Sequence, residues 1–173
     1  PNIIRKNRNS VAVITGNETK EQMEALADDI FRYFGLGCRN VSKIYLPEEY
    51  DLDHFFNAMY SWKEVINNHK YMNNYQYYKT IYALNLETYT DFHFYLLRPN
   101  KNINSHPSII HYEFYTSISE LEKQLTIEKD KIQCISSNLT LRNAIKFGKA
   151  QKPKISEFAD QINTLTFIND LFT

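Results

Sequence analysis

A strand–helix–strand unit near the start of the chain constrains the fold more than any other feature. Residues 11–14 read Val-Ala-Val-Ile, a short apolar and mostly β-branched run that predicts a buried strand. Thr19 and Gln22 then form a capping-box pattern, which begins a helix. The apolar side chains of this helix recur at helical spacing and are Met23, Leu26, Ala27, Ile30, Phe31 and Phe34. We expect Gly35 and Gly37 to end the helix.

The alternation of strands and helices continues through most of the chain. Further strands are predicted at residues 41–46, 92–96, 109–115 and 131–136. Further helices are predicted at residues 51–59, 62–66, 70–86 and 117–125, with one or two short helices in the tail at 156–172. Since helices alternate with strands, the sequence predicts an α/β domain whose largely parallel sheet is flanked by helices.

Composition excludes several classes of protein. The 173 residues, of which 43% are hydrophobic, are enough for one globular domain with its own core. Lys plus Arg equals Asp plus Glu at 20 each, so no net positive charge attracts nucleic acid. No apolar run is long enough to span a membrane, and no signal-peptide pattern opens the chain. Two widely separated cysteines argue against a disulfide framework and indicate a reduced, cytoplasmic setting.

Cys38 carries more chemical information than any other residue. It follows Gly35-Leu36-Gly37 at the predicted exit of the first helix and comes just before a strand. Small residues there let a substrate approach closely, and Arg39 is a candidate cation to favour the thiolate. Local chemistry leaves two interpretations open, a nucleophile or a cysteine packed as a small hydrophobe. A catalytic role predicts an accessible sulfur on an open cleft at the carboxyl edge of the sheet.

Four stretches of the chain resemble acyl-CoA reductases of the LuxC family, which are distant relatives of aldehyde dehydrogenases. They are NSVAVITGNETKEQMEALADDIFRYFGLGCRNVSKIYLP, HKYMNNYQYYKTIYALN, IQCISSN and FGKAQKPKISEFADQINTLTFI. The resemblance covers nearly the whole chain. In the aldehyde dehydrogenase superfamily a Gly-x-x-Cys turn joins a helix to a strand, and Gly35-Leu36-Gly37-Cys38 lies where that turn is expected.

The resemblance implies an aldehyde-dehydrogenase-like catalytic domain that reduces long-chain acyl-CoA or acyl-protein thioesters to fatty aldehydes. It implies that Cys38 is the acylated nucleophile, with Gly37, Arg39 and Asn40 around the substrate and its oxyanion. The reductant is NADPH, bound mainly by an N-terminal domain that residues 1–173 do not contain, and NADH stays open because its determinants lie elsewhere. Since the chain opens on Pro1 rather than Met, we expect it to be a piece of a longer protein. An acyl-protein synthetase and a second copy of the chain are expected partners.

The sequence departs from hydrolytic aldehyde dehydrogenases at two places. Residues 5–10, where those enzymes carry a glutamate that activates water, hold no carboxylate, which suits a reductase whose acyl-enzyme must survive. Residues 105–108, Ser-His-Pro-Ser, occupy the place of a segment that holds the nicotinamide ribose. His106 is therefore a candidate for cofactor contact, against the ordinary interpretation of a surface histidine.

The remaining candidate residues indicate no second site. Cys134 lies within an apolar strand and is interpreted as structural. The five histidines show no paired metal-ligand spacing, so no metal is expected. Two alternatives to a long-chain acyl-CoA reductase stay open. One is a non-catalytic interaction or oligomerisation domain with the same fold, and the other is a short-chain acylating aldehyde dehydrogenase.

Overall fold

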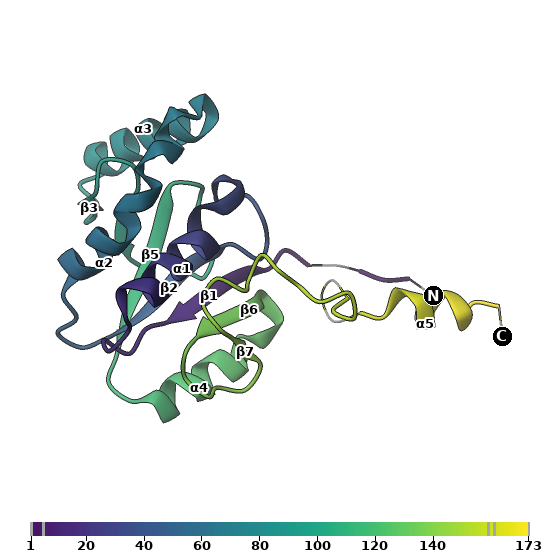
Figure 1. The fold of residues 1–173 in the computed structure, drawn as a ribbon. Coiled ribbons are helices and arrows are strands. Elements are labelled where there is room, and N and C mark those ends of the chain that lie inside the picture. The colour runs from purple at the N-terminus through teal and green to yellow at the C-terminus, as the bar shows by residue number, and fades with distance from the viewer. Residues whose placement is uncertain (1, 5, 159, 161, 173) are drawn as a thin grey trace.

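The computed structural model describes residues 2–4, 6–158, 160 and 162–172. In this part of the chain a seven-stranded sheet has the order β3-β4-β5-β2-β1-β6-β7 (Figure 1). β3 is antiparallel to β4, and every other neighbouring pair is parallel. The prediction of an α/β domain with a largely parallel sheet and flanking helices is therefore confirmed.

The elements alternate along the chain as the sequence predicts. The strands are β1 (Asn9–Val13), β2 (Val41–Pro47), β3 (Thr90–Asp91), β4 (Leu96–Pro99), β5 (Ile109–Tyr115), β6 (Ile132–Ser137) and β7 (Ala144–Ile145). The α-helices are α1 (Lys20–Phe31), α2 (Leu52–Met59), α3 (His69–Leu84), α4 (Ile118–Ile127) and α5 (Thr164–Asn169). Short 3₁₀ segments are η1 (Arg32–Gly35), η2 (Tyr60–Asn67) and η3 (Lys129–Lys131).

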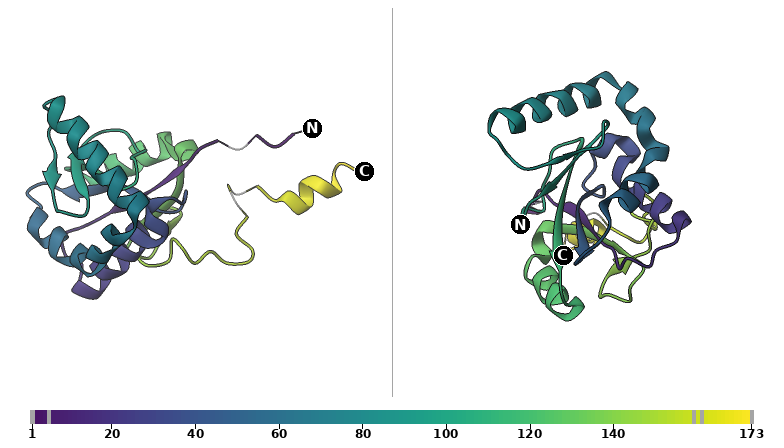
Figure 2. Two further views of the ribbon diagram at one scale, coloured as in Figure 1. Left: turned by 90° about the horizontal axis from the view of Figure 1, so that it is seen from above. Right: turned by 90° about the vertical axis from the view of Figure 1, so that its left-hand side faces the viewer.

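Helices cover both faces of the sheet because successive strand residues point to opposite sides. Ala12 of β1 and Ile14, the residue after this strand, face α1, α2 and η2 in the largest apolar core. Val11 and Val13 face the other way and pack with Leu121 of α4. α3 lies against β4 and β5 at the far end of the sheet, where its tyrosines form a third cluster with the strand side chains (Figure 2).

The start of α1 follows the sequence prediction, whereas its end does not. Thr19 accepts from the Gln22 N–H at 3.3 Å and the Gln22 side chain accepts from the Thr19 N–H at 2.9 Å, which completes the capping box. The helix ends at Phe31 and not at Gly35, because Tyr33 and Phe34 both adopt left-handed backbone angles. Phe34, predicted to lie on the apolar face, is instead exposed.

The predicted strand at residues 92–96 is wrong, since β4 begins only at Leu96. Phe92 and Phe94 lie in a tight bend, where the Phe92 N–H donates to the Tyr95 carbonyl and His93 has a φ of 71°. Their rings are buried in an aromatic cluster with Phe31 and not in a pleated strand. The alternation of phenylalanines therefore reflects packing of a bend against α1.

An irregular segment at residues 100–104 replaces a helix in the crossover from β4 to β5. Three successive carbonyls of this segment accept hydrogen bonds from side chains of the sheet. Lys43 Nζ donates to the Lys101 carbonyl at 2.8 Å, the His111 ring to Asn102 at 2.9 Å, and Ser42 to Ile103 at 2.8 Å. Lys43 is fully buried and also pairs with Glu113 at 2.6 Å, so this buried charge has a partner.

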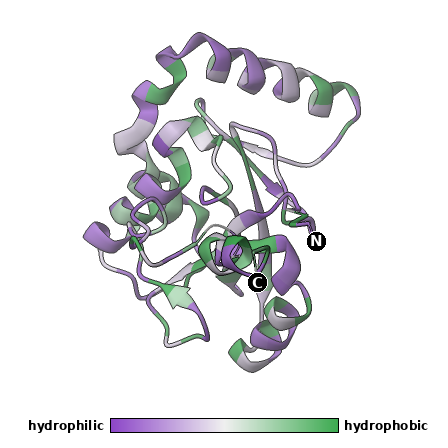
Figure 3. Cartoon of the chain, turned by 90° about the vertical axis from the view of Figure 1, so that its right-hand side faces the viewer, coloured by the Kyte–Doolittle hydropathy of each residue, from purple (hydrophilic) through white to green (hydrophobic). Residues whose placement is uncertain are grey.

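Both terminal segments leave the body of the domain from the amino edge of the parallel strands. Residues before β1 and the segment leading to α5 run side by side away from the sheet (Figures 1 and 2), and both contribute to one surface hollow. α5 exposes Leu165, and Phe172 beyond it is also exposed. Hydrophilic residues predominate along α3, in keeping with its mostly solvated surface (Figure 3). No described helix combines the length and the apolarity that crossing a bilayer requires.

The buried ring of His111 makes stability depend on pH. Burial lowers the pKa of His111 from its usual 6.5 to about 4. Between those values the unfolded chain binds a proton that the folded chain does not, so the free energy of unfolding falls as the pH drops. Relative to His111→Gln, we expect wild type to lose about 3 kcal/mol from about pH 7 to about pH 4, measured by urea unfolding. The exposed His69→Gln is the control, and an equal change there would refute the assignment.

Candidate functional site

Cys38 lies in a four-residue turn that connects η1 to β2. The Asn40 N–H donates to the Gly37 carbonyl at 3.0 Å and closes the turn, and the Cys38 side chain is exposed. Because the turn leads into a parallel strand, it lies at the amino edge of the sheet. The expectation of a thiol at the carboxyl edge is therefore wrong, whereas the expected accessibility is observed.

Asn40 holds the turn in place and is almost fully buried, with 2% of its surface exposed. Its amide nitrogen donates to the carbonyls of Asp29 at 3.2 Å, Ile30 at 3.0 Å and Arg32 at 2.7 Å, at the end of α1. Its amide oxygen accepts from the Gly37 N–H at 2.9 Å. Since every polar atom of the side chain is engaged, Asn40 is a positioning residue and does not point to a substrate.

Gly37 and Ser10 complete the support of the turn. A side-chain carbon on Gly37 would lie 2.9 Å from the Asn40 amide oxygen, a distance too short for any residue but glycine. Ser10, fully buried in β1, donates its hydroxyl to the Cys38 carbonyl at 3.0 Å. The carbonyl side of Cys38 is thereby tied to the sheet, which leaves its thiol on the outer side.

Two consecutive backbone N–H groups in this turn are free. Neither Cys38 nor Arg39 donates its backbone N–H to an acceptor within the described part of the chain. Free N–H groups next to a nucleophile are the usual donors to an oxyanion that forms when a carbonyl is attacked. The turn therefore combines an accessible thiol with donors for the charge that its reaction would create.

The guanidinium of Arg39 is bound by the C-terminal segment. Its guanidinium donates to the Ala150 carbonyl and to the Glu157 carboxylate, the latter at 3.3 Å. Both partners belong to the C-terminal segment, so Arg39 fastens that segment to the turn. The guanidinium charge of Arg39 is therefore paired with Glu157, and its role beside Cys38 stays a prediction.

A buried carboxylate anchors the segment that Arg39 reaches. Asp29 of α1 accepts from the N–H groups of Gly148 at 2.8 Å and Ala150 at 3.0 Å, and from the Ser136 hydroxyl at 3.2 Å. Burial raises the pKa of Asp29 to about 6, although these donors favour the charged form. Asp29 therefore links α1, β6 and the segment before the tail into one support for the Cys38 turn.

A groove of about 480 Å³ opens beside the turn at the amino ends of β6 and β7. Arg39, Cys134, Asn143 and Phe158 are among its lining residues, which mix polar and apolar groups. Its volume lies within the usual range for small-molecule sites. Cys38 is not among its lining residues, whereas the next residue, Arg39, is, so the expectation that Cys38 itself lies on an open cleft is not met.

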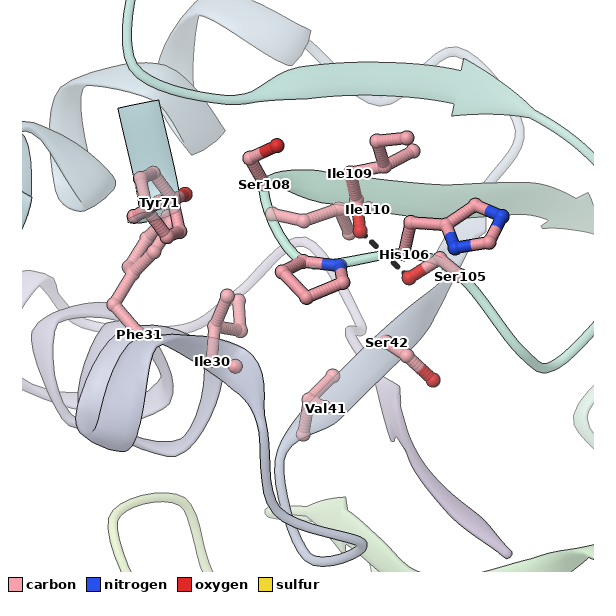
Figure 4. Close-up of a pocket in the computed structure, with 12 residues that line it drawn as sticks. Ile30, Phe31, Val41, Ser42, Tyr71, Ser105, His106, Ser108, Ile109 and Ile110 are labelled. Atoms are coloured by element: carbon pink, nitrogen blue, oxygen red, sulfur yellow. Dashed lines mark hydrogen bonds between the residues drawn. The ribbon is translucent and has the colours of Figure 1, made fainter. Parts of the chain in front are cut away.

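A much smaller cavity borders η1 and the start of β2, where Figure 4 shows His106 next to Ser105. Its volume of about 20 Å³ holds a water molecule and no larger ligand. The hydroxyls of Ser108 and Tyr71 are buried there without a protein partner. His106 is exposed and stacks on Tyr78 at 4.2 Å. Its proposed contact with a cofactor stays a prediction.

Sequence reasoning missed two of the residues that support the site. Asp29 stands next to Asp28 in the sequence, and such a pair is typical of a solvated helix face. Its place three residues after Leu26 and next to Ile30, on the apolar side of α1, is the signal that could have revealed a buried carboxylate. Ser10, in contrast, carries no local signal, because its partner Cys38 is reached only through the fold. Within the described residues no group of three or more His, Cys, Asp or Glu is placed to hold a metal.

Comparison with known proteins identifies a related fold. No family model and no curated protein matches the sequence. Among solved structures, an indole-3-acetaldehyde dehydrogenase in complex with NAD⁺ matches with a TM-score of 0.50 at 9% identity. The chain shares its fold with part of an aldehyde dehydrogenase. The match covers 85% of this chain and 35% of the dehydrogenase, so the chain spans about a third of that protein.

Loss of the Asn40 amide should disorder the Cys38 turn. In Asn40→Ala three carbonyls and the Gly37 N–H lose their partner, and we expect a destabilisation of about 2–4 kcal/mol. Asn40→Asp keeps the acceptor for Gly37 but places a carboxylate against three carbonyls, so it should be no more stable near neutral pH. Urea unfolding measures the change, with the exposed Asn17→Ala as control. A loss below about 0.5 kcal/mol would show that the contacts do not hold the turn.

Proposed function

We propose that this chain is the thiol-bearing part of an aldehyde-dehydrogenase-like oxidoreductase, and that Cys38 accepts an acyl group from a thioester. The observation that carries the proposal is the exposed Cys38 thiol on a turn with two free backbone N–H groups. The shared fold supports the assignment to this class of protein. The proposed substrate is a long-chain fatty acyl-CoA or acyl-protein thioester, reduced overall to the fatty aldehyde.

The residues of this chain account for the acyl-transfer step. The Cys38 thiolate attacks the thioester carbonyl, so that a new S–C bond forms. The N–H groups of Cys38 and Arg39 donate to the developing oxyanion, and the bond to the CoA sulfur then breaks. Asn40 and Ser10 hold the turn in this geometry throughout. The proton of the Cys38 thiol leaves with the released CoA thiol or to solvent.

The residues described here do not form a complete dinucleotide site. The cavity beside His106 is too small for a nicotinamide ring, and no Gly-rich turn follows a strand and opens a helix. The proposal therefore assigns NADPH to a separate N-terminal domain. Both terminal segments run away from the sheet at its amino edge (Figure 1), which is also the edge at which the Cys38 turn enters β2.

Acylation of Cys38 is directly measurable. Incubation with a long-chain acyl-CoA should add the acyl mass to a peptide that contains Cys38, and hydroxylamine should remove it as expected for a thioester. Cys38→Ser should not form this thioester, whereas Cys134→Ser should keep it. Absence of the adduct in a folded wild-type protein would favour the alternative of a non-catalytic interaction domain. Preferential acylation by short acyl-CoAs would favour a short-chain acylating aldehyde dehydrogenase.

A second test asks whether this chain can use NADPH without the proposed N-terminal domain. This chain alone, mixed with acyl-CoA and NADPH, should oxidise the cofactor at a rate near background while Cys38 still becomes acylated. The physical reason is that the chain has no Gly-rich turn between a strand and a helix to hold the pyrophosphate of a dinucleotide. The decrease of NADPH absorbance measures the rate. Sustained turnover by this chain would show that the cofactor site is contained in it.

A further inference from the structure

Cys134 lies much closer to Cys38 in the fold than their separation in sequence suggests. In the parallel pairing of β1 with β6, Asn9 stands opposite Ile132 and Val11 opposite Ile135. The register shifts between these two pairs, so Ser10 lies opposite the part of β6 that contains Gln133 and Cys134. The Ser10 hydroxyl donates to the Cys38 carbonyl at 3.0 Å, so one serine borders both cysteines.

The next residue along the chain confirms this neighbourhood. The side chain of Arg39 lines the same groove as Cys134. Burial raises the pKa of the Cys134 thiol, and the negative charge of Cys38 and of Glu157 adds to that effect. Arg39 and the Ser10 side chain act in the opposite direction and favour the thiolate. The Cys134 thiol therefore lies close enough to Cys38 for the charge of Cys38 to affect its pKa.

The two cysteines differ in solvent exposure, as do the thiol that an oxidant attacks and the second thiol that then forms a disulfide with it. Cys38 is exposed, whereas Cys134 has only 7% of its surface exposed. An oxidant in solution therefore reaches Cys38 first. We propose that Cys38 and Cys134 form a reversible disulfide when the protein meets hydrogen peroxide. Formation of this disulfide does not depend on the proposed function. Only its consequence, that the disulfide protects a catalytic nucleophile, rests on the proposed function.

The reaction is balanced with hydrogen peroxide as the oxidant. The Cys38 thiolate attacks a peroxide oxygen, an S–O bond forms, the O–O bond breaks, and hydroxide leaves. Cys38 is now an uncharged sulfenic acid, so its negative charge no longer opposes ionisation of Cys134. The Cys134 thiolate then attacks the Cys38 sulfur, the S–S bond forms and the S–O bond breaks. Two thiols and one peroxide have become one disulfide and two molecules of water.

Disulfide formation requires a local movement of Cys38 within the turn. A disulfide needs the two Cα atoms within about 7 Å of each other. Asn40 and Gly37 hold the base of the turn and keep their contacts. The N–H groups of Cys38 and Arg39 have no acceptor in the described residues, so the movement of Cys38 costs the hydrogen bond from the Ser10 hydroxyl to its carbonyl and no backbone–backbone bond.

Peptide mapping without reduction tests the proposal. The wild-type chain is treated with peroxide, its free thiols are blocked, and the digest is examined by mass spectrometry with and without dithiothreitol. We expect one peptide pair that joins Cys38 to Cys134 and separates on reduction. Cys134→Ser should form no such pair and should accumulate about tenfold more Cys38 sulfinic acid at the same dose.

The peptide map of the oxidised wild-type protein tests the proposal by itself, even if Cys134→Ser folds poorly. A linked pair within one chain supports the proposal. Cys38 sulfinic acid without a linked pair, or Cys38–Cys38 bonds between two chains alone, would overturn it. The measurement contains no acyl thioester, so its result is independent of whether Cys38 is acylated by acyl-CoA.

Discussion

The buried amide of Asn40 is the interaction on which the rest of the site depends. It satisfies three carbonyls at the end of α1 and the N–H of Gly37 at the same time. A helix end and a strand start are thereby fixed to each other through one side chain. Because unsatisfied buried polar groups are costly, this geometry has few alternatives. The hydrogen bonds of Asn40 therefore fix the position of the turn that carries the Cys38 thiol.

A second layer of support reaches the turn from the other side. Asp29 fixes the segment that contains Gly148 and Ala150, and Arg39 reaches the Ala150 carbonyl from the turn. The site is therefore assembled from β1, the end of α1, the start of β2 and the C-terminal segment. None of these elements could present the thiol alone. The accessible side of Cys38 is the one direction in which the structure leaves the turn open.

The candidate site lies at the amino edge of the parallel sheet, which is not the usual place for a ligand site. Ligands in open α/β sheets ordinarily bind at the carboxyl ends of the strands. Here the candidate thiol lies where a turn enters β2, at the amino edge from which both terminal segments leave. The proposed second domain would complete the site at this edge, and the proposed Cys38–Cys134 disulfide would protect the exposed thiol from further oxidation.

Local features of the sequence were sufficient for most of the elements. The capping box at Thr19 and the apolar run of β1 each depend on neighbours in the chain, and both were predicted correctly. The sequence by itself also singled out Cys38 as the candidate nucleophile, since Cys38 alone follows two glycines before a strand. Only the tertiary structure decided that α1 stops at Phe31, that Phe92 and Phe94 lie in a bend, and that Asn40 is internal support. The physical reason is that these outcomes depend on hydrogen bonds and ring packing between segments far apart in the chain, which no local pattern contains.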